Sequence, residues 1–338
     1  SWFGRVNYDY AGKYLFEANI RADASSRFAK GHRWGYFPSF SAAWRISEEA
    51  FMEEAVGWLT DLKIRGSYGN LGNQSALSDF YPWMNSYDLD AHYSLNGSLQ
   101  TGYHQKNYKI ATISWEKART WGVGIDATLF GKLTVGLDYY DRKTTGIIMD
   151  VPVPAEFGLG AYKDNVGAMV NRGVELTLNY NESWDDWSFG VSANLAYNKN
   201  KVLYLDGVQS LADGDLKVKQ VGAAYGTYRL YKTGGFFQSD EEAKRWQEKH
   251  KNDAGYPFKR DFKAGDLIYM DTNEDGLINA DDRVLCGSSN PSYTFGLNLS
   301  AGYKSIDCSV MLTGVADVKR MIDINGFGGD WSGDDCHP

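Results

Sequence analysis

The sequence predicts an all-β fold, an antiparallel portion of a transmembrane β-barrel with about ten strands and long extracellular loops. Ten segments alternate between apolar and polar residues with a period of two, which is typical of strands with one apolar face. The connections between these segments are alternately short and long. Aromatic residues, which make up 15% of the chain, lie near many segment ends.

The composition excludes several classes of protein. The chain has 338 residues and a net charge of −8, which argues against a nucleic-acid partner because such a partner needs a basic face. Mean hydropathy is −0.45, and no stretch approaches the roughly 20 apolar residues of a membrane helix. A barrel stays possible because its strands show lipid only every second residue. The three cysteines form no metal-binding pattern.

The first 70 residues supply four segments. Apolar residues of the second segment, such as Phe16 and Ile20, alternate with polar ones such as Glu17 and Arg21. Between the third and fourth segments, Ser47 followed by acidic residues predicts the N-cap of a short helix over 47–60. The four segments cover residues 3–10, 14–24, 36–46 and 62–69.

The other six segments come in pairs, each joined by a short turn. The first pair meets at Gly131, the second at residues 183–186 and the third at residues 303–304. The segments cover residues 121–129, 133–139, 174–180, 187–195, 293–300 and 306–312.

An up-and-down strand order places all the long connections at one end. Transmembrane barrels have this asymmetry, with short periplasmic turns and long extracellular loops. We therefore expect one barrel domain over 1–338 whose longest extracellular loops cover about 70–116, 146–171 and 201–291. No signal peptide opens the chain, so we expect that it was removed or that the chain is an internal piece of a longer protein.

The last long loop contains an acidic motif over residues 271–282, DTNEDGLINADD. Its spacing is that of an EF-hand-type calcium loop, with Gly276 at the sharp turn and Asp in place of Glu at position 12, as in dockerin-type loops. The alternative is a metal-free acidic turn. We expect a structural Ca²⁺ bound by side-chain oxygens and one backbone carbonyl, from Asp271, Asn273, Asp275, Leu277 and Asp282.

Other loop features are less specific. Residues 238–250 predict a short amphipathic helix, either solvated or facing a partner. The five histidines form no catalytic grouping, and GxSxG and P-loop motifs are absent from the sequence, so we expect no enzymatic activity. Aromatic loop residues could stack on sugar rings or simply pack the loops; these are Tyr81, Trp83, Tyr87, Tyr93 and Tyr103.

Several long stretches resemble the SusC/RagA-type TonB-dependent outer-membrane transporters. They run in the family's order through most of residues 1–315. The stretches are RVNYDYAGKYLFEANIRADASSRFAKGHRWGYFPSFSAAWRISEE, LKIRGSYGNLGNQ, SWEKARTWGVGIDATLFGKLTVGLDYYDRKTTGII, NVGAMVNRGVELTLNYN and GDLIYMDTNEDGLINADDRVLCGSSNPSYTFGLNLS.

The resemblance implies a bacterial outer-membrane barrel of 22 strands that encloses a plug domain and imports glycans or peptides. It also implies three kinds of partner: a SusD-like lipoprotein on the extracellular side, the TonB complex and outer-membrane lipid. This chain departs from the family in lacking a plug domain and a TonB-contacting segment, and in ending without a closing strand. We therefore expect an internal barrel portion of a longer transporter, or a truncated relative.

Two alternatives stay open at this point. A secreted, soluble β-rich binding or adhesion module with a dockerin-like calcium loop would bury the apolar faces in a closed interior. A siderophore or cobalamin receptor would use the same barrel, although the stretches above resemble the glycan and peptide importers better.

Overall fold

The computed structural model describes residues 1–321, except 56, 78–79, 85–86, 106–109, 152–155, 157, 159–160, 207–209 and 214–215. Cys336 and the predicted non-strand ending therefore lie outside the described residues. The chain divides into two compact units: unit 1 is Ser1–Gln209 with Ser292–Ala316, and unit 2 is Ser210–Pro291 with Asp317–Pro338. None of the helices in the described part is long and apolar enough to span a bilayer.

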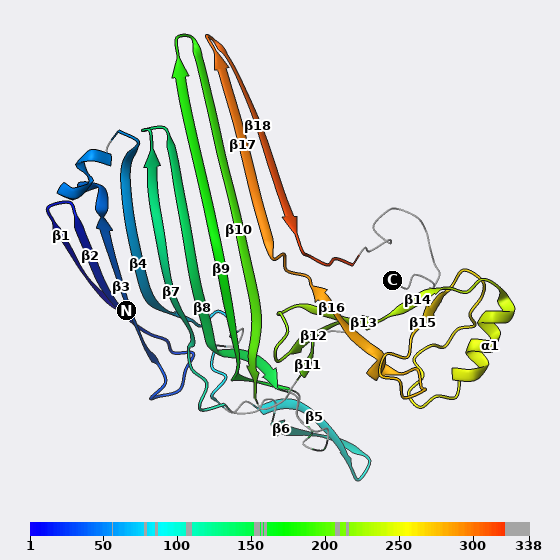
Figure 1. Cartoon of the computed structure of the whole chain (residues 1–338). Helices are drawn as coiled ribbons and strands as arrows, with labels where there is room; N and C mark the ends of the chain where they lie inside the picture. Colours follow the sequence, from blue (N-terminus) through cyan, green and yellow to red (C-terminus); the bar gives the residue numbers. More distant parts are fainter. Residues whose placement is uncertain are drawn as a thin grey trace. The chain divides into compact units, whose positions relative to one another are not determined.

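Unit 1 contains a ten-stranded antiparallel sheet in which each strand pairs with the next strand of the sheet along the chain, as Figure 1 shows. The ten predicted segments are confirmed as its strands. In sheet order they are β1 (Trp2–Tyr10), β2 (Tyr14–Ala24), β3 (Trp34–Arg45), β4 (Leu59–Asn73), β7 (Glu116–Leu129), β8 (Leu133–Val151), β9 (Tyr162–Trp184), β10 (Trp187–Leu205), β17 (Tyr293–Tyr303) and β18 (Ile306–Ala316).

The short turns lie at one end of the sheet, as the sequence predicts. In the β1–β2 turn, Ala11 and Gly12 both have positive φ, and the backbone N–H of Gly12 donates to Asp9 Oδ1 at 2.8 Å. Phe130 and Gly131 repeat the positive φ pair in the β7–β8 turn. Two consecutive left-handed residues match the twist of the flanking strands, so these tight hairpins fix the register.

The predicted helix over 47–60 is wrong in type. The chain forms two short 3-10 helices, η1 (Ile46–Glu48) and η2 (Ala50–Ala55). Ser47 caps neither; its hydroxyl donates to Asp61 Oδ1 at 2.9 Å. Glu49, between the two helices, accepts from the Tyr14 hydroxyl at 2.6 Å and from the Trp44 indole at 3.1 Å. This anchor holds the segment close to the sheet, in a turn too tight for a continuous α-helix.

The loop boundaries predicted at 146–171 and 70–116 are also wrong, because the strands continue further. β8 and β9 stay paired up to Val151 and Tyr162, and β4 and β7 up to Asn73 and Glu116. Beyond the apolar band the two faces no longer differ in polarity, so the period-two pattern fades while the backbone ladder persists. The region that remains between β4 and β7 contains a hairpin of β5 (Tyr87–Leu95) and β6 (Ser98–Gln105).

Unit 2 occupies most of the region 201–291, which the sequence predicts to be one long loop. It contains a four-stranded sheet of β11 (Ser210–Asp213), β12 (Lys217–Gln220), β13 (Thr227–Tyr231) and β16 (Arg283–Ser288). A two-stranded sheet of β14 (Thr233–Phe236) and β15 (Leu267–Tyr269), helix α1 (Asp240–His250) and the 3-10 helix η4 (Ala280–Asp282) complete it.

Helix α1 confirms the predicted amphipathic helix. Its N-cap is Ser239, whose hydroxyl accepts the backbone N–H of Glu242 at 3.2 Å, and the Glu242 carboxylate accepts the backbone N–H of Gln238 at 2.7 Å. The apolar side of α1 packs on a small core of Phe237, Ala243, Phe262, Tyr269 and Ile278. Ile278 belongs to the acidic motif, so the motif is anchored to the core of unit 2.

Candidate functional site

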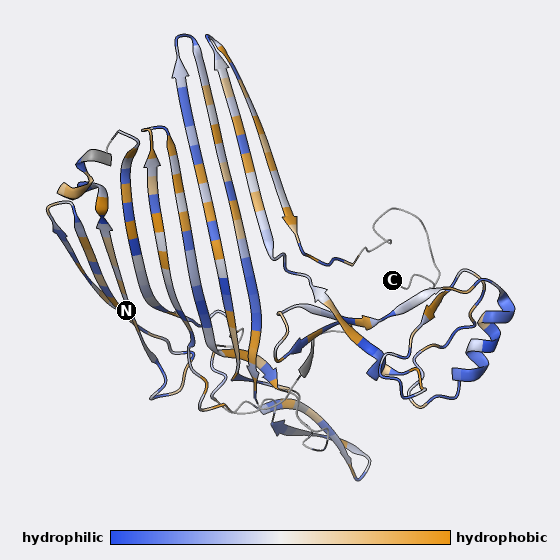
Figure 2. Ribbon diagram, in the orientation of Figure 1, coloured by the Kyte–Doolittle hydropathy of each residue, from blue (hydrophilic) through white to orange (hydrophobic). Residues whose placement is uncertain are grey.

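Strand register in unit 1 aligns the apolar residues into rows that cross the whole sheet. Figure 2 shows the alternation of apolar and polar residues along the strands. One row of directly opposed residues contains only aromatic, aliphatic and glycine residues on all ten strands. From β1 to β18 the row is Tyr10, Tyr14, Trp44, Ile64, Ile125, Leu137, Leu176, Leu195, Phe295 and Gly314.

This row starts beside the short turns on β1 to β3 and ends near the long connections on β17. It therefore shifts along the strands as it crosses the sheet, which is the stagger that tilted strands need in a barrel. The apolar run on β10 extends from Trp187 to Tyr197. At about 3.4 Å per residue it is about 34 Å long, and a tilt of about 40° reduces this to about 26 Å, close to the height of a barrel's apolar band.

Aromatic pairs mark both ends of the apolar band. At the turn end, Tyr14 stacks on Trp44 with ring centroids 6.4 Å apart, and Trp187 lies 4.4 Å from Tyr303. At the other end, Tyr197 lies 4.8 Å from Tyr293, and Trp121 lies 5.4 Å from Tyr139. Rings of this kind prefer the boundary between apolar and polar surroundings, so the pairs have the position of interfacial girdles.

The apolar face is not enclosed. Val135, Leu176 and Leu297 are half-buried, and Leu137 is 45% exposed. A soluble module with a dockerin-like loop requires these side chains in a closed interior. The described part of unit 1 forms no such interior around them, so that alternative is wrong for this sheet.

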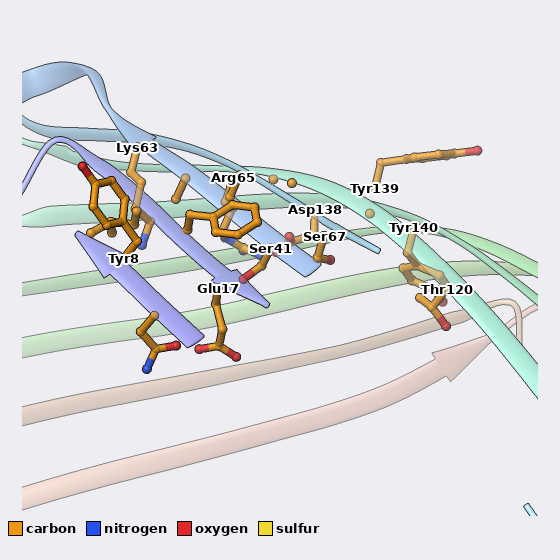
Figure 3. Close-up of a pocket in the computed structure, with 18 of the residues that line it drawn as sticks. Tyr8, Glu17, Ser41, Lys63, Arg65, Ser67, Thr120, Asp138, Tyr139 and Tyr140 are labelled. Carbon is orange, nitrogen blue, oxygen red and sulfur yellow. The ribbon is translucent and has the colours of Figure 1, made fainter. Parts of the chain in front are cut away.

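The opposite face of the sheet is polar and forms a hollow of about 790 Å³. Figure 3 shows Lys63, Arg65 and Asp138 among the side chains that line it, with the neighbouring Tyr139 and Tyr140 pointing to opposite sides of β8. Four carboxylates and two cations line the hollow, from Asp9, Glu17, Asp138, Glu175, Lys63 and Arg65.

Arg65 is the centre of an ion-pair cluster on this face. Its guanidinium donates to Asp126 at 3.0 Å and to Asp138 at 2.6 Å, and Lys63 lies 3.0 Å from Asp126. These side chains remain about one third exposed, so each pair contributes only about 0.2–1 kcal/mol. The cluster fixes charged groups on the polar face more than it stabilises the sheet.

Gly124 makes the cluster possible. A Cβ atom at this position would lie 2.4 Å from Asp138 Oδ1 and 2.9 Å from Arg65 Cζ. The guanidinium therefore lies across bare backbone, where it reaches carboxylates on β7 and β8 together. The same device recurs at Gly173, where the Tyr140 ring occupies the place of a Cβ atom.

The connecting segments at the long-loop end pack into a core of their own. Phe28 and Phe37 contact Trp115 with ring centroids 5.2 and 5.6 Å apart. Asn165 joins two of these segments, because its side chain accepts from the Ser114 N–H and donates to the Ser114 and Gly146 carbonyls. The core consists of Phe28, Phe37, Leu77, Ile110, Ile113, Trp115 and Ile148.

The acidic motif folds into a tight loop. Asp271 Oδ2 accepts the N–H of Gly276, whose φ is +82°, and Asp275 Oδ1 accepts the N–H of Leu277. Asp282 is fully buried and accepts from the backbone N–H groups of Thr272 and Asn279. β15 precedes the loop in place of the first helix of an EF-hand.

The predicted calcium ligands lie in one loop, but their acidic side chains do not gather around a common point. Within the described part, no three His, Cys, Asp or Glu side chains form a metal-binding group. Asp271 Oδ1, however, is buried without a hydrogen-bond partner. A buried carboxylate oxygen without a partner is costly, and a cation would satisfy it. The residues fit a calcium ion to this extent, and the predicted ligand set stays a prediction.

The comparison with protein families decides the identity of the fold. The family described as "TonB dependent receptor-like, beta-barrel" matches residues 1–315. The chain belongs to this family.

Curated relatives of this barrel family share the description. TonB-dependent receptor P26 of Formosa agariphila is 34% identical over 319 residues, covering 93% of this chain and 31% of its own length. TonB-dependent receptor SusC of Bacteroides thetaiotaomicron is 28% identical over 330 residues, covering 92% of this chain and 30% of its own length. The chain thus spans about a third of the length of these relatives, and the resemblance to SusC-type receptors is confirmed.

Solved structures agree on the fold. The RagAB peptide importer in its closed-closed state superposes with a TM-score of 0.75 and 24% identity, covering 94% of this chain and 33% of that one. A second structure, of the RagAB peptide transporter, gives the same TM-score with 23% identity, covering 93% of this chain and 33% of that one. This likeness shows that the ten-stranded sheet has the fold of a portion of the barrel in these structures.

Sequence reasoning on this barrel did not find the Arg65 cluster or the Phe28–Trp115 core. A signal for the first is the placement of opposite charges on strands that pair, Arg65 against Asp126 and Asp138, with Gly124 between them. Aromatic loop residues flagged in the sequence are solvent-accessible: Tyr87 and Tyr103 are 56% and 73% exposed and contact each other on the β5–β6 hairpin. The described structure assigns no substrate to them.

Proposed function

We propose that this chain forms part of the wall of a bacterial outer-membrane importer. The apolar face contacts lipid, and the polar face lines a water-filled interior that the substrate crosses. One observation supports this most strongly. The directly opposed row from Tyr10 to Phe295 is apolar on strand after strand, with aromatic pairs at both ends of the band. A lipid-facing barrel surface needs this arrangement.

The edges of the sheet support a larger assembly. In the described structure β1 and β18 each pair with one neighbour. In a bilayer an unpaired strand edge costs several kcal/mol for each exposed backbone group. We propose that both edges pair with further strands of a barrel of about 22 strands, around a plug domain, as the resemblance to SusC-type transporters implies.

The cargo is proposed to be a glycan or a peptide. One structural neighbour is named a peptide importer, and one curated relative carries the name SusC. A SusD-like lipoprotein would capture the cargo on the extracellular side, and TonB would supply energy through a segment outside this chain. No observation on the described residues favours a siderophore or cobalamin.

Uptake by the full-length protein tests the importer. Deleting the gene in its host should abolish uptake of a labelled oligosaccharide or oligopeptide panel, and a plasmid copy should restore it. Restored uptake should stop when TonB is removed, and the protein should fractionate with the outer membrane and copurify with a lipoprotein. Unchanged uptake after deletion, across a panel that the host consumes, would contradict the proposal.

We also propose that the acidic loop of unit 2 binds Ca²⁺ in a structural role. The ligands would be Asp271, Asn273, Asp275, Leu277 through its carbonyl, and Asp282. The buried Asp271 oxygen without a partner and the turn at Gly276 support it. Because Ile278 lies in the core of unit 2, a bound ion would stabilise that core.

A further inference from the structure

Unit 2 contains a hollow of about 740 Å³ with a basic lining. Its lining combines basic residues with aromatic and aliphatic ones, and none of the described lining residues is Asp or Glu. The basic residues are Arg229, Lys259, Arg260 and Arg283. The chain as a whole has a net charge of −8, so a cluster of four cations without a carboxylate in the same lining runs against the overall composition.

Two hollows in unit 1 have the opposite balance. The one on the polar face of unit 1 has more carboxylates than cations, and the small one beside the β9–β10 turn contains Glu182 and Asp307 without a basic residue. The positive lining of the unit 2 hollow is therefore not shared by these two hollows.

Several of the basic groups are held in place. The Arg283 guanidinium lies 5.1 Å from the centre of the Tyr231 ring, and the Arg229 Nε–H donates to the Arg283 carbonyl at 3.3 Å. Arg260 lies over the Phe262 ring at 5.2 Å and is 3.6 Å from Asp266. Lys259 is exposed. Pre-positioned guanidinium groups lose little freedom on binding, and their planar donors match the oxygens of carboxylates and sulfates.

Aromatic walls complete the hollow. Phe258 stacks on Tyr269 at 4.3 Å, and Tyr231 contacts both rings at 5.6 and 5.7 Å. The buried Tyr231 hydroxyl has no hydrogen-bond partner. A hollow of this size exceeds the needs of a single inorganic ion and lies in the range of small organic ligands, about 300–1,000 Å³. A sugar ring has apolar faces that pack on aromatic walls, and its hydroxyl groups accept hydrogen bonds from guanidinium donors.

We propose that the unit 2 hollow binds an acidic sugar unit, one carrying a carboxylate or a sulfate. The anionic group pairs with Arg229, Lys259 and Arg283, and the sugar ring packs on the Tyr231 and Phe258 side of the hollow. Within the hollow, β13 pairs with strands on both sides and offers no edge for strand addition, whereas β14, β15 and β16 each have one partner strand. A peptide bound at one of those edges is therefore the competing outcome of the test. This inference deepens the proposed import function by naming an anionic glycan as the ligand class.

Binding is measured by calorimetry on the full-length protein in detergent, without transport. The probes are a galacturonate trisaccharide, a sulfated galactose trisaccharide, the neutral galactose trisaccharide, a triglutamate peptide and inorganic sulfate. We expect one of the two acidic sugars to bind at least about tenfold more tightly than the other three probes, with affinity falling as salt rises. Whichever acidic sugar binds identifies the anion.

The variants are Lys259→Gln, Arg283→Gln and, as the control, Lys244→Gln, an exposed cation of α1 outside the hollow. Each change in the hollow should weaken the acidic sugar about tenfold, and the control should leave it unchanged. Lys259 has an exposed side chain, so its variant keeps the test valid if Arg283→Gln unfolds.

Equal binding of neutral and acidic sugars, tighter binding of the peptide or of sulfate, or equal loss in the Lys244 control would overturn the site. If the acidic sugar does not bind but uptake is intact, the anionic-sugar site is refuted and the proposed import function is not. If the acidic sugar binds but the full-length protein supports no uptake, only the proposed import function is refuted.

Discussion

A pair of neighbouring residues on β10 separates the two faces of the sheet most sharply. Val191 lies in the apolar band, opposite Leu299 and Tyr180, while Ser192 is exposed on the polar face, opposite Asn298 and Asn179. Both lie near the middle of the run from Trp187 to Tyr197. Arginine at the midplane of a barrel's lipid face costs about 2–4 kcal/mol, whereas a lumen position tolerates it.

We therefore expect Val191→Arg to lower the free energy of unfolding of the full-length barrel by about 2–4 kcal/mol, a factor of about 30–900 in the folding equilibrium. Ser192→Arg should change it by less than about 0.5 kcal/mol. Reversible unfolding by guanidinium in lipid vesicles measures both, with band-shift electrophoresis as the check on barrel closure. Equal losses, or a larger loss for Ser192→Arg, would refute the assignment of the faces.

Three further outcomes follow from the same structure. Gly124→Val should displace Arg65 from Asp138 and lower the thermal midpoint, whereas Gly131→Asn, in a turn of the same hairpin, should be tolerated; equal effects would contradict the role of Gly124. Ca²⁺ should raise the thermal midpoint of unit 2 in the wild type and in Asp281→Asn but not in Asp271→Asn, as calorimetry would show; a shift that survives in Asp271→Asn would remove the site. Burial of the Tyr256 hydroxyl, with a smaller contribution from the negative charge of Asp253, raises the pKa of Tyr256 to about 12. An unfolded tyrosine ionises near pH 10, so this contribution to stability is complete below pH 10 and declines as pH rises towards 12. Absorbance titration of the wild type against Tyr256→Phe reports it, and a group titrating near 10 would contradict the burial.

Much of the barrel wall was predictable because its physics is local in sequence. One face of each strand contacts apolar surroundings and the other polar ones, so a period of two identifies a strand such as β17 without knowledge of its partners. Turn chemistry at Gly12 and Gly131 then fixes which strands pair. The alternation of short and long connections places the short turns at one end of the sheet and the long connections at the other.

Features that depend on the third dimension were not predictable. β8 and β9 extend to Val151 and Tyr162 through backbone pairing, where side-chain polarity no longer alternates. The Arg65 cluster joins β4, β7 and β8, whose register only the folded sheet shows. The sequence predicted a loop in place of unit 2 because the core residues of this unit, such as Phe237 and Phe262, come from short segments with no regular hydrophobic period.

A cysteine scan of β10 from Trp187 to Tyr197 directly tests which face of the sheet contacts lipid. The native cysteines are first replaced by serine, and each new cysteine carries a fluorophore in the full-length protein in lipid vesicles. We predict that a lipid-soluble quencher acts at positions such as Val191, Ala193 and Leu195, and an aqueous quencher at Ser192 and Asn194. The opposite alternation, or none, would contradict a barrel wall with lipid on its apolar face.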